Sequence, residues 1–154
     1  MPETVERIFH LFTDVEHAAQ HVSAIRKTEM LTTGTFSRGT RWLETREVLG
    51  RLDKAEMEVT AFETNRSYTI THHKGGVRID TTFTFEPIPS GTEVSIEFAL
   101  NSQGLPPGLL SPLEWALAGK VRDALGHDLA DLKTSVEKIL LSETGSHGGV
   151  GGLD

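Results

Sequence analysis

One long amphipathic helix near the C-terminus constrains the fold of this chain more than any other stretch. Residues 111–141 open with Ser111, Pro112 and Glu114, a helix start in which serine caps, proline fits the first turn and glutamate completes a capping box. Apolar residues then recur every three or four positions: Leu113, Leu117, Val121, Leu125, Leu129, Leu132, Val136 and Ile139. Such a helix spans roughly 45 Å at about 1.5 Å per residue. Its apolar stripe therefore needs a large apolar partner surface.

An antiparallel sheet of six strands is predicted to supply that surface. Between residues 28 and 101, polar and apolar side chains alternate in short runs, which is typical of strands with one buried and one solvent-facing side. The predicted strands are 29–33, 40–49, 53–62, 67–73, 77–86 and 92–101. Tight links are predicted at Gly50-Arg51 and at Lys74-Gly75-Gly76. Short links between consecutive strands give a meander, which we expect to curve around the long helix.

Two short helices are predicted before the strands, over residues 2–13 and 15–24. In the first, Val5, Ile8, Phe9 and Phe12 share one face. A chain of 154 residues suits one domain with a sizeable core. We assign residues 1–141 to that domain and the glycine-rich residues 142–154 to a flexible tail.

Composition narrows the possible functions. The net charge of −7 disfavours nucleic acid as a partner and an anionic membrane as the main target. The absence of cysteine excludes thiolate chemistry and disulfides, and is compatible with a reducing compartment. No run approaches the ~20 apolar residues of a membrane span, and no segment resembles a signal peptide. We therefore expect a cytoplasmic protein with no membrane span.

No cofactor or metal is expected from the motifs. His17 and His21 have the i, i+4 spacing of two zinc ligands, but no third ligand follows at a telling distance, and surface histidines are the simpler interpretation. The sequence contains no glycine-rich phosphate loop, dinucleotide fingerprint or nucleophile elbow.

Several short segments, taken in order, resemble the SRPBCC superfamily of START-related, helix-grip and polyketide cyclase/dehydrase proteins. They are residues 5–16, 39–41, 58–60, 90–92 and 132–133, with Glu137 near the end. The resemblance implies an α+β helix-grip fold: a curved antiparallel sheet of about six strands wrapped around a long C-terminal helix, with two short N-terminal helices. Members usually begin with a further strand. Its lack here would leave sheet edges open to homodimerisation, unless the natural start lies upstream of Met1.

The resemblance also implies a cavity between sheet and helix that holds a lipid- or polyketide-like ligand. The residues predicted to bind such a ligand are Trp42, Met57, Val59, Tyr68, Ile70, Phe83, Phe98, Leu117 and Val121. The alternative is that these side chains simply fill a core. Gly119 and Gly126 each cost about 1 kcal/mol in a helix interior. We therefore expect the first half of the long helix to act as a mobile lid and the second half to anchor it.

Trp42, Glu44 and Arg46 form the most suggestive polar set, since alternation puts all three on one strand face. Alternation does not decide whether this face or the opposite one lines the cavity. Aromatase/cyclase members resemble this strand, with a tryptophan and, four residues on, an arginine that orients polyketide oxygens; Glu44 stands where they have a small hydroxyl residue. Arg46 would polarise a carbonyl while Glu44 accepts a proton. The alternative is a solvated ion pair.

His72 shares a strand face with Tyr68 and Ile70, so it is a candidate general base or a rim residue. The leading functional prediction is a carrier of a small hydrophobic ligand rather than an enzyme. One alternative is a polyketide cyclase, aromatase or dehydratase with Arg46, Glu44 and His72 as its working groups. Another is a protein–protein interaction or chaperone-type module.

Overall fold

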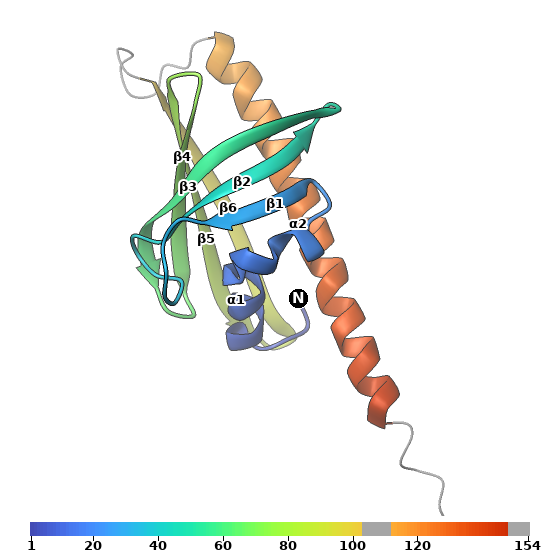
Figure 1. Cartoon of the computed structure of the whole chain (residues 1–154). Helices are drawn as coiled ribbons and strands as arrows, with labels where there is room; N and C mark the ends of the chain where they lie inside the picture. The colour runs from blue at the N-terminus through green and yellow to red at the C-terminus, as the bar shows by residue number, and fades with distance from the viewer. Residues whose placement is uncertain (103–111, 148–154) are drawn as a thin grey trace, which may run out of the picture.

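The computed structural model describes residues 1–102 and 112–147, with side chains described over 1–102 and 114–139. Its elements run in the order α1 (Val5–Thr13), η1 (Val15–Gln20), β1 (Ile25–Met30), β2 (Arg41–Val48), β3 (Arg51–Glu63), β4 (Ser67–Lys74), β5 (Val77–Ile88), β6 (Gly91–Ser102) and α2 (Pro112–His147). The six strands form one antiparallel sheet in sequence order. Figure 1 shows this sheet curving, with α2 crossing it diagonally and α1 and η1 beside it. The predicted helix-grip architecture is confirmed.

Element boundaries differ from the sequence-based ones in four places. The second helix is a 3-10 helix that ends at Gln20, and β1 begins earlier than predicted, at Ile25. The first hairpin turns at Leu49-Gly50, both with positive φ, rather than at Gly50-Arg51. Helix α2 continues to His147, past the predicted end at residue 141, because glycine lowers helix propensity without forbidding a helix. The predicted cap Ser111 and residues 148–154 of the predicted tail lie outside the described residues.

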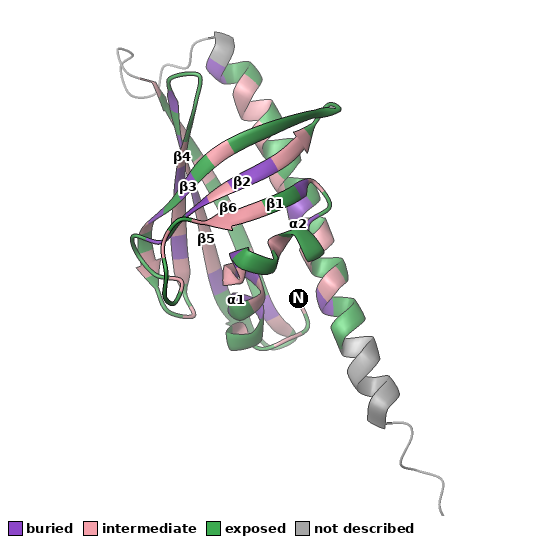
Figure 2. Cartoon of the chain, in the orientation of Figure 1, coloured by how far each residue is buried: buried purple, intermediate pink, exposed green. Residues whose placement is uncertain are grey.

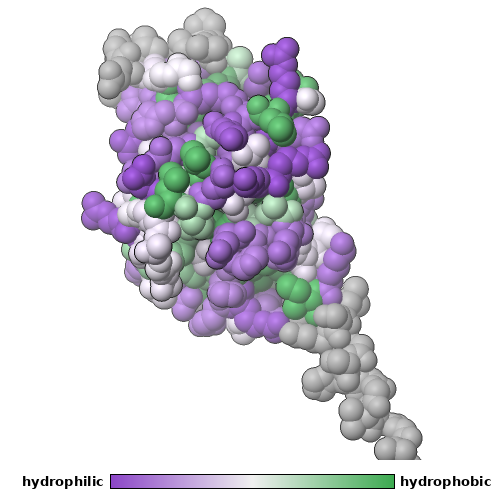
Figure 3. Space-filling view, viewed as in Figure 1, coloured by the Kyte–Doolittle hydropathy of each residue, from purple (hydrophilic) through white to green (hydrophobic). Residues whose placement is uncertain are grey.

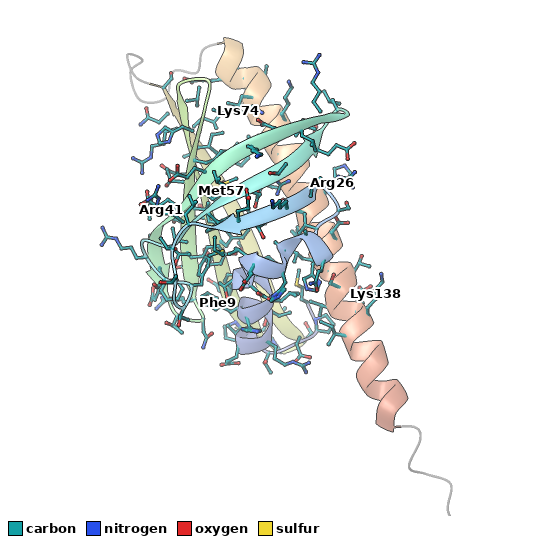
Figure 4. All side chains as sticks on the ribbon, viewed as in Figure 1. Phe9, Arg26, Arg41, Met57, Lys74 and Lys138 are labelled. Atoms are coloured by element: carbon teal, nitrogen blue, oxygen red, sulfur yellow. The ribbon has the colours of Figure 1, made fainter. Side chains whose placement is uncertain are left out.

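Aromatic side chains fill one part of the interior, between α1 and the sheet. Thr4 caps α1, and its hydroxyl accepts a hydrogen bond from the Arg7 amide. The helix then buries Ile8, Phe9 and Phe12 (Figures 2 and 4). The ring centroid of Phe85 lies 5.2 Å from that of Phe9 and 5.3 Å from that of Phe12, both edge-on. These contacts fix α1 against β4 and β5.

The N-terminal residue lies against the start of β6. The Met1 amino group donates to the Thr92 carbonyl at 2.7 Å, and the Thr92 amide donates to the Met1 carbonyl at 2.8 Å. Gly91 (φ +141°) makes this approach possible, because a Cβ there would lie 2.1 Å from the Met1 carbonyl oxygen. Part of the β6 edge is thus covered from within the chain.

The rest of β6 and the outer side of β1 have no neighbouring strand among the described residues. Homodimerisation through these edges stays a prediction, which multi-angle light scattering at micromolar concentration tests. Among the described helices, none is long and apolar enough to cross a membrane.

Candidate functional site

A cavity of about 260 Å³ lies between the sheet, the end of α1, η1 and the part of α2 from Leu117 to Leu132. Its walls are mainly apolar. The predicted ligand residues that line it are Trp42, Met57, Tyr68, Ile70, Phe83, Leu117 and Val121. Ile79 and Ile96 from the sheet and Leu125 and Leu129 from α2 complete the apolar part. Figure 4 shows Met57 within the sheet that forms one wall.

Two predicted ligand residues, Val59 and Phe98, do not line this cavity. Val59 is 1% exposed and packs in the core cluster with Phe9 and Phe85. Phe98 instead lies beneath the Arg122 guanidinium of α2, whose central carbon is 5.9 Å from the ring centroid. Val59 pairs with Ile70 and Phe98 pairs with Thr81, and both of these partners line the cavity. Val59 and Phe98 therefore lie beside the cavity in the same row of the sheet, covered by other side chains.

Strand β2 turns the face with Trp42, Glu44 and Arg46 toward the cavity. Arg41 lies on the opposite face, is exposed, and pairs with Glu56 of β3 on the outer surface of the sheet. Figure 4 shows Arg41 pointing away from the interior. The orientation that alternation left open is therefore set by burial. Trp42 is 1% exposed and its side chain needs the interior.

Arg46 holds two carboxylates inside the cavity, one from its own strand and one from α2. Its Nε donates to Glu44 Oε2 at 2.9 Å. One terminal nitrogen donates to Asp128 Oδ1 at 3.1 Å and the other to Asp128 Oδ2. Trp42 Nε1 donates to Glu44 Oε1 at 3.5 Å. We call Glu44, Arg46 and Asp128 the charged triad. It links sheet and helix by a bidentate ion pair.

Burial determines the electrostatics of the charged triad. The side chains of Glu44, Asp128 and Arg46 are 9%, 13% and 22% exposed. Burial alone would lower the pKa of Arg46, but hydrogen bonds and charge from Asp128 and Glu44 outweigh it and raise that pKa. Burial raises the pKa of Asp128, although Arg46 acts in the opposite direction, and the neighbouring Glu44 carboxylate adds to the rise. With both carboxylates ionised, the triad carries one net negative charge.

His72 and Tyr68 also line the cavity, and both are held neutral by their surroundings. Burial lowers the pKa of His72, and the positive charges of Arg46 and Lys74 lower it further. Burial raises the pKa of Tyr68, whose hydroxyl donates to the Phe12 carbonyl at 3.4 Å. A neutral imidazole can accept a proton, although a lowered pKa makes it a weaker base, so general-base chemistry at His72 stays a prediction.

The cavity opens at the ends of the β2–β3 and β4–β5 hairpins. Among the residues with described side chains, exposed ones line it only there and on α2, and we call this set the mouth: Val48, Asp53, Lys54, His73, Lys74, Lys120 and Ala124. Lys74 Nζ pairs with Asp53 Oδ2 across two strands at 3.0 Å. Figure 4 shows Lys74 at this end of the molecule.

The second half of α2 makes several polar contacts with the rest of the fold. Asp131 accepts hydrogen bonds from the amide (2.9 Å) and the hydroxyl (2.8 Å) of Ser23. His21 Nδ1 contacts the Ser135 hydroxyl at 3.2 Å, and Val136 is 4% exposed. The described part of the first half begins with Glu114, which accepts a hydrogen bond from Ser102. Its residues Leu117, Val121 and Leu125 face the cavity.

Asp128 was not singled out from the sequence, although a signal was present. It follows Val121 and Leu125 at the i+7 and i+3 positions, so it lies within the apolar stripe of α2. A carboxylate at such a position requires a buried cationic partner. Arg46 was the one strongly suggested cavity cation, so the pair could have been inferred.

His17 and His21 do not come together as metal ligands. His17 lies in η1, and its Nδ1 is 2.8 Å from an Asp14 carboxylate oxygen. His21 instead contacts Ser135 of α2. Within the described residues, no group of three or more histidines, aspartates and glutamates is arranged to hold a metal ion.

In a comparison with known protein families, residues 2–137 match one family model, described as polyketide cyclase/dehydrase and lipid transport. No curated protein sequence matches the chain.

Solved structures share the fold at low sequence identity. The Zhui aromatase/cyclase from a Streptomyces species has a TM-score of 0.70 at 14% identity, covering 90% of each chain. A START superfamily protein from Mycobacterium smegmatis has a TM-score of 0.67 at 18% identity, covering 90% of this chain and 93% of that one. TTHA0849 from Thermus thermophilus has a TM-score of 0.64 at 18% identity, covering 93% of both.

Proposed function

Because the chain belongs to the polyketide cyclase/dehydrase and lipid transport family, we propose that it binds and carries a small, mainly apolar molecule with one polar end. The observation that carries this proposal is an apolar cavity of about 260 Å³ with a single buried charged group, the triad, in its wall. Apolar walls bind by desolvation, and a few placed polar groups orient the ligand.

The charge of the triad favours a neutral or cationic polar end over a carboxylate. Three of the five Arg46 N–H groups already bind Glu44 and Asp128. An anionic ligand would therefore meet two carboxylates and a guanidinium that is largely occupied. A hydroxyl group can donate to Glu44 or Asp128 and accept from the remaining Arg46 N–H groups. We propose an aliphatic or phenolic alcohol as the ligand class.

Isothermal titration calorimetry with ten-carbon probes tests this class. We expect 1-decanol to bind, and decanoate to bind at least tenfold more weakly. Across a series of primary alcohols, affinity should rise about fourfold per methylene until the cavity is full. Absence of binding by every alcohol of the series, together with flat thermal shifts, would contradict the proposal.

Two matched variants locate the binding. Ile70→Trp places a larger side chain in the cavity, whereas Phe98→Trp enlarges a residue of β6 that does not line it. We expect the first to lower decanol affinity at least tenfold and the second to leave it unchanged. Circular dichroism checks that both fold. Asp128→Asn removes one negative charge, so the preference for decanol over decanoate should shrink.

A cyclase or aromatase is the second candidate, favoured by Arg46 and a neutral His72 in one cavity. There, His72 would take a proton from the carbon next to a ketone, and the free Arg46 N–H groups would hold the enolate oxygen. Hydrogen–deuterium exchange of 2-undecanone in D₂O, followed by NMR, measures this step. Exchange above the buffer rate that disappears in His72→Asn, with decanol binding unchanged, would support the enzyme. Exchange at the buffer rate in the wild type would contradict the enzyme and leave the carrier function as the remaining proposal.

A further inference from the structure

The tip of the β2–β3 hairpin, residues 48–52, exposes aliphatic side chains to an unusual extent. Leu49 is 90% exposed, Leu52 70% and Val48 38%. The tip extends from the sheet beside α2 (Figure 1). Figure 3 shows apolar groups gathered among hydrophilic ones on the upper part of the same face. Single exposed leucines are common, but two exposed leucines and an exposed valine within the five residues of a hairpin tip indicate a contact surface.

The backbone of this tip adds a second, independent observation. Val48 pairs with Arg51, so Leu49 and Gly50 form a two-residue turn, with φ of 51° and 76°. That turn favours asparagine, aspartate or glycine at its first position, since a leucine side chain is strained at positive φ.

The adjacent β4–β5 hairpin makes the same turn with Gly75 and Gly76, at φ of 57° and 78°, and so avoids the strain. Leu49 is thus disfavoured both by its conformation and by its exposure. Local strain of this kind is kept where a residue has a task beyond folding.

Around the tip, positive side chains outnumber negative ones, and some of the positive ones are unpaired. Arg26 pairs with Glu47, and Lys74 pairs with Asp53. Arg51, Lys54 and Lys120 are exposed and form no ion pair within the described part of the chain. The chain as a whole carries −7, but at physiological salt only charges within about 8 Å of a surface act on it strongly.

We propose that the hairpin tip docks this protein on a phospholipid bilayer, with the cavity mouth at the membrane surface. Leu49 and Leu52 would enter the acyl boundary, while Arg51 and Lys54 contact lipid phosphates. Val48 belongs to both the tip and the mouth, and Lys54 of the mouth lies two residues beyond the tip. An apolar ligand would therefore pass between membrane and cavity without crossing water. This inference rests on the proposed carrier function.

Vesicle flotation tests the docking. Full-length protein is mixed with vesicles of phosphatidylcholine alone, or of phosphatidylcholine with about 30% phosphatidylglycerol. This share supplies several anionic lipids within a Debye length of the docked tip. We expect binding to the anionic vesicles, weakened by salt. Leu49→Asn with Leu52→Thr should reduce it at least tenfold, and Arg51→Ala or Lys54→Ala about fivefold each.

Leu49→Asn introduces the residue that the turn favours, so thermal stability should hold or rise while vesicle binding falls. The matched control is Leu31→Asn, which removes a leucine that is 46% exposed beyond the opposite end of β2. We expect this variant to bind vesicles like the wild type.

Three outcomes would overturn the proposal: no vesicle binding by the wild type, equal loss in Leu31→Asn, or unchanged binding in the Leu49/Leu52 variant. If the wild type ignores vesicles but the Leu49/Leu52 variant changes self-association, the tip is a protein contact and the membrane assignment is wrong. Decanol titration separates the two levels of inference. Decanol binding without vesicle binding removes the docking surface and leaves the carrier standing.

Discussion

Two parts of one interior are built in opposite ways. Under α1, aromatic rings from helix and sheet meet edge-on and fill the space between them, as with Phe9 and Phe85. Under the first half of α2, the described cavity-lining residues are Leu117, Lys120, Val121, Ala124 and Leu125, and a cavity remains. None of the described α2 residues that line the cavity is aromatic. A sheet becomes core or pocket according to the size of the side chains that the covering helix presents.

The largest expected effect is the loss of a ring from the filled part. Phe85→Ala should lower the free energy of unfolding by about 3–5 kcal/mol, since the remaining rings relax only partly into the space. Ile70→Ala, beside the existing cavity, should cost clearly less. Urea denaturation measures both. Equal losses would mean that the two parts are packed alike.

The second largest loss of unfolding free energy should come from removing Arg46, the cation of the charged triad. Arg46→Met leaves Glu44 and Asp128 buried without their partner, which should cost about 3 kcal/mol at neutral pH. Adding Glu44→Gln and Asp128→Asn to the same chain should restore much of that loss, because no unpaired charge remains. The comparison is made by urea denaturation at pH 7. A loss that persists in the triple variant would place the effect in packing rather than charge.

The cavity should also respond to pH through His72. Its pKa is about 6.5 in the unfolded chain and lower in the folded one, so the unfolded state binds more protons as pH falls below 6.5. The folded state therefore loses stability there, by at most about 1.4 kcal/mol per pH unit from this group. His72→Asn lacks this loss, so its stability relative to wild type should increase from pH 7.5 to 5.5. A difference independent of pH would contradict the assignment.

The smallest expected effect comes from comparing variants in the two halves of α2. Gly126→Ala should raise stability by about 1 kcal/mol, since a Cβ there meets nothing within 4 Å. If the first half moves to admit ligand, decanol release should also slow. Ala130→Gly, on the anchored half, should lower stability by a similar amount and leave release unchanged. Stopped-flow displacement measures the rate, and an unaltered rate in Gly126→Ala would contradict the lid.

Much of the fold followed from local patterns, because alternation and a helical stripe each report which side of an element is buried. They do not report which neighbour covers an inward side chain. Val59 and Phe98 alternate like cavity residues and pair with the cavity residues Ile70 and Thr81, but the core cluster covers Val59 and Arg122 covers Phe98. The partner of Arg46 was missed for a related reason. Asp128 is 82 residues away in sequence, and only the crossing of α2 over β2 brings the two together.

Trp42 makes the cavity accessible to intrinsic tryptophan fluorescence. The chain has two tryptophans: Trp42 in the cavity wall, with its indole nitrogen 3.5 Å from Glu44, and Trp115, which is 68% exposed. Trp115→Phe would leave one fluorophore whose emission depends on the polarity of the cavity and on the charge beside it. Ligand entry, the exclusion of water and a change in the triad could then be followed in the unlabelled protein, each in real time.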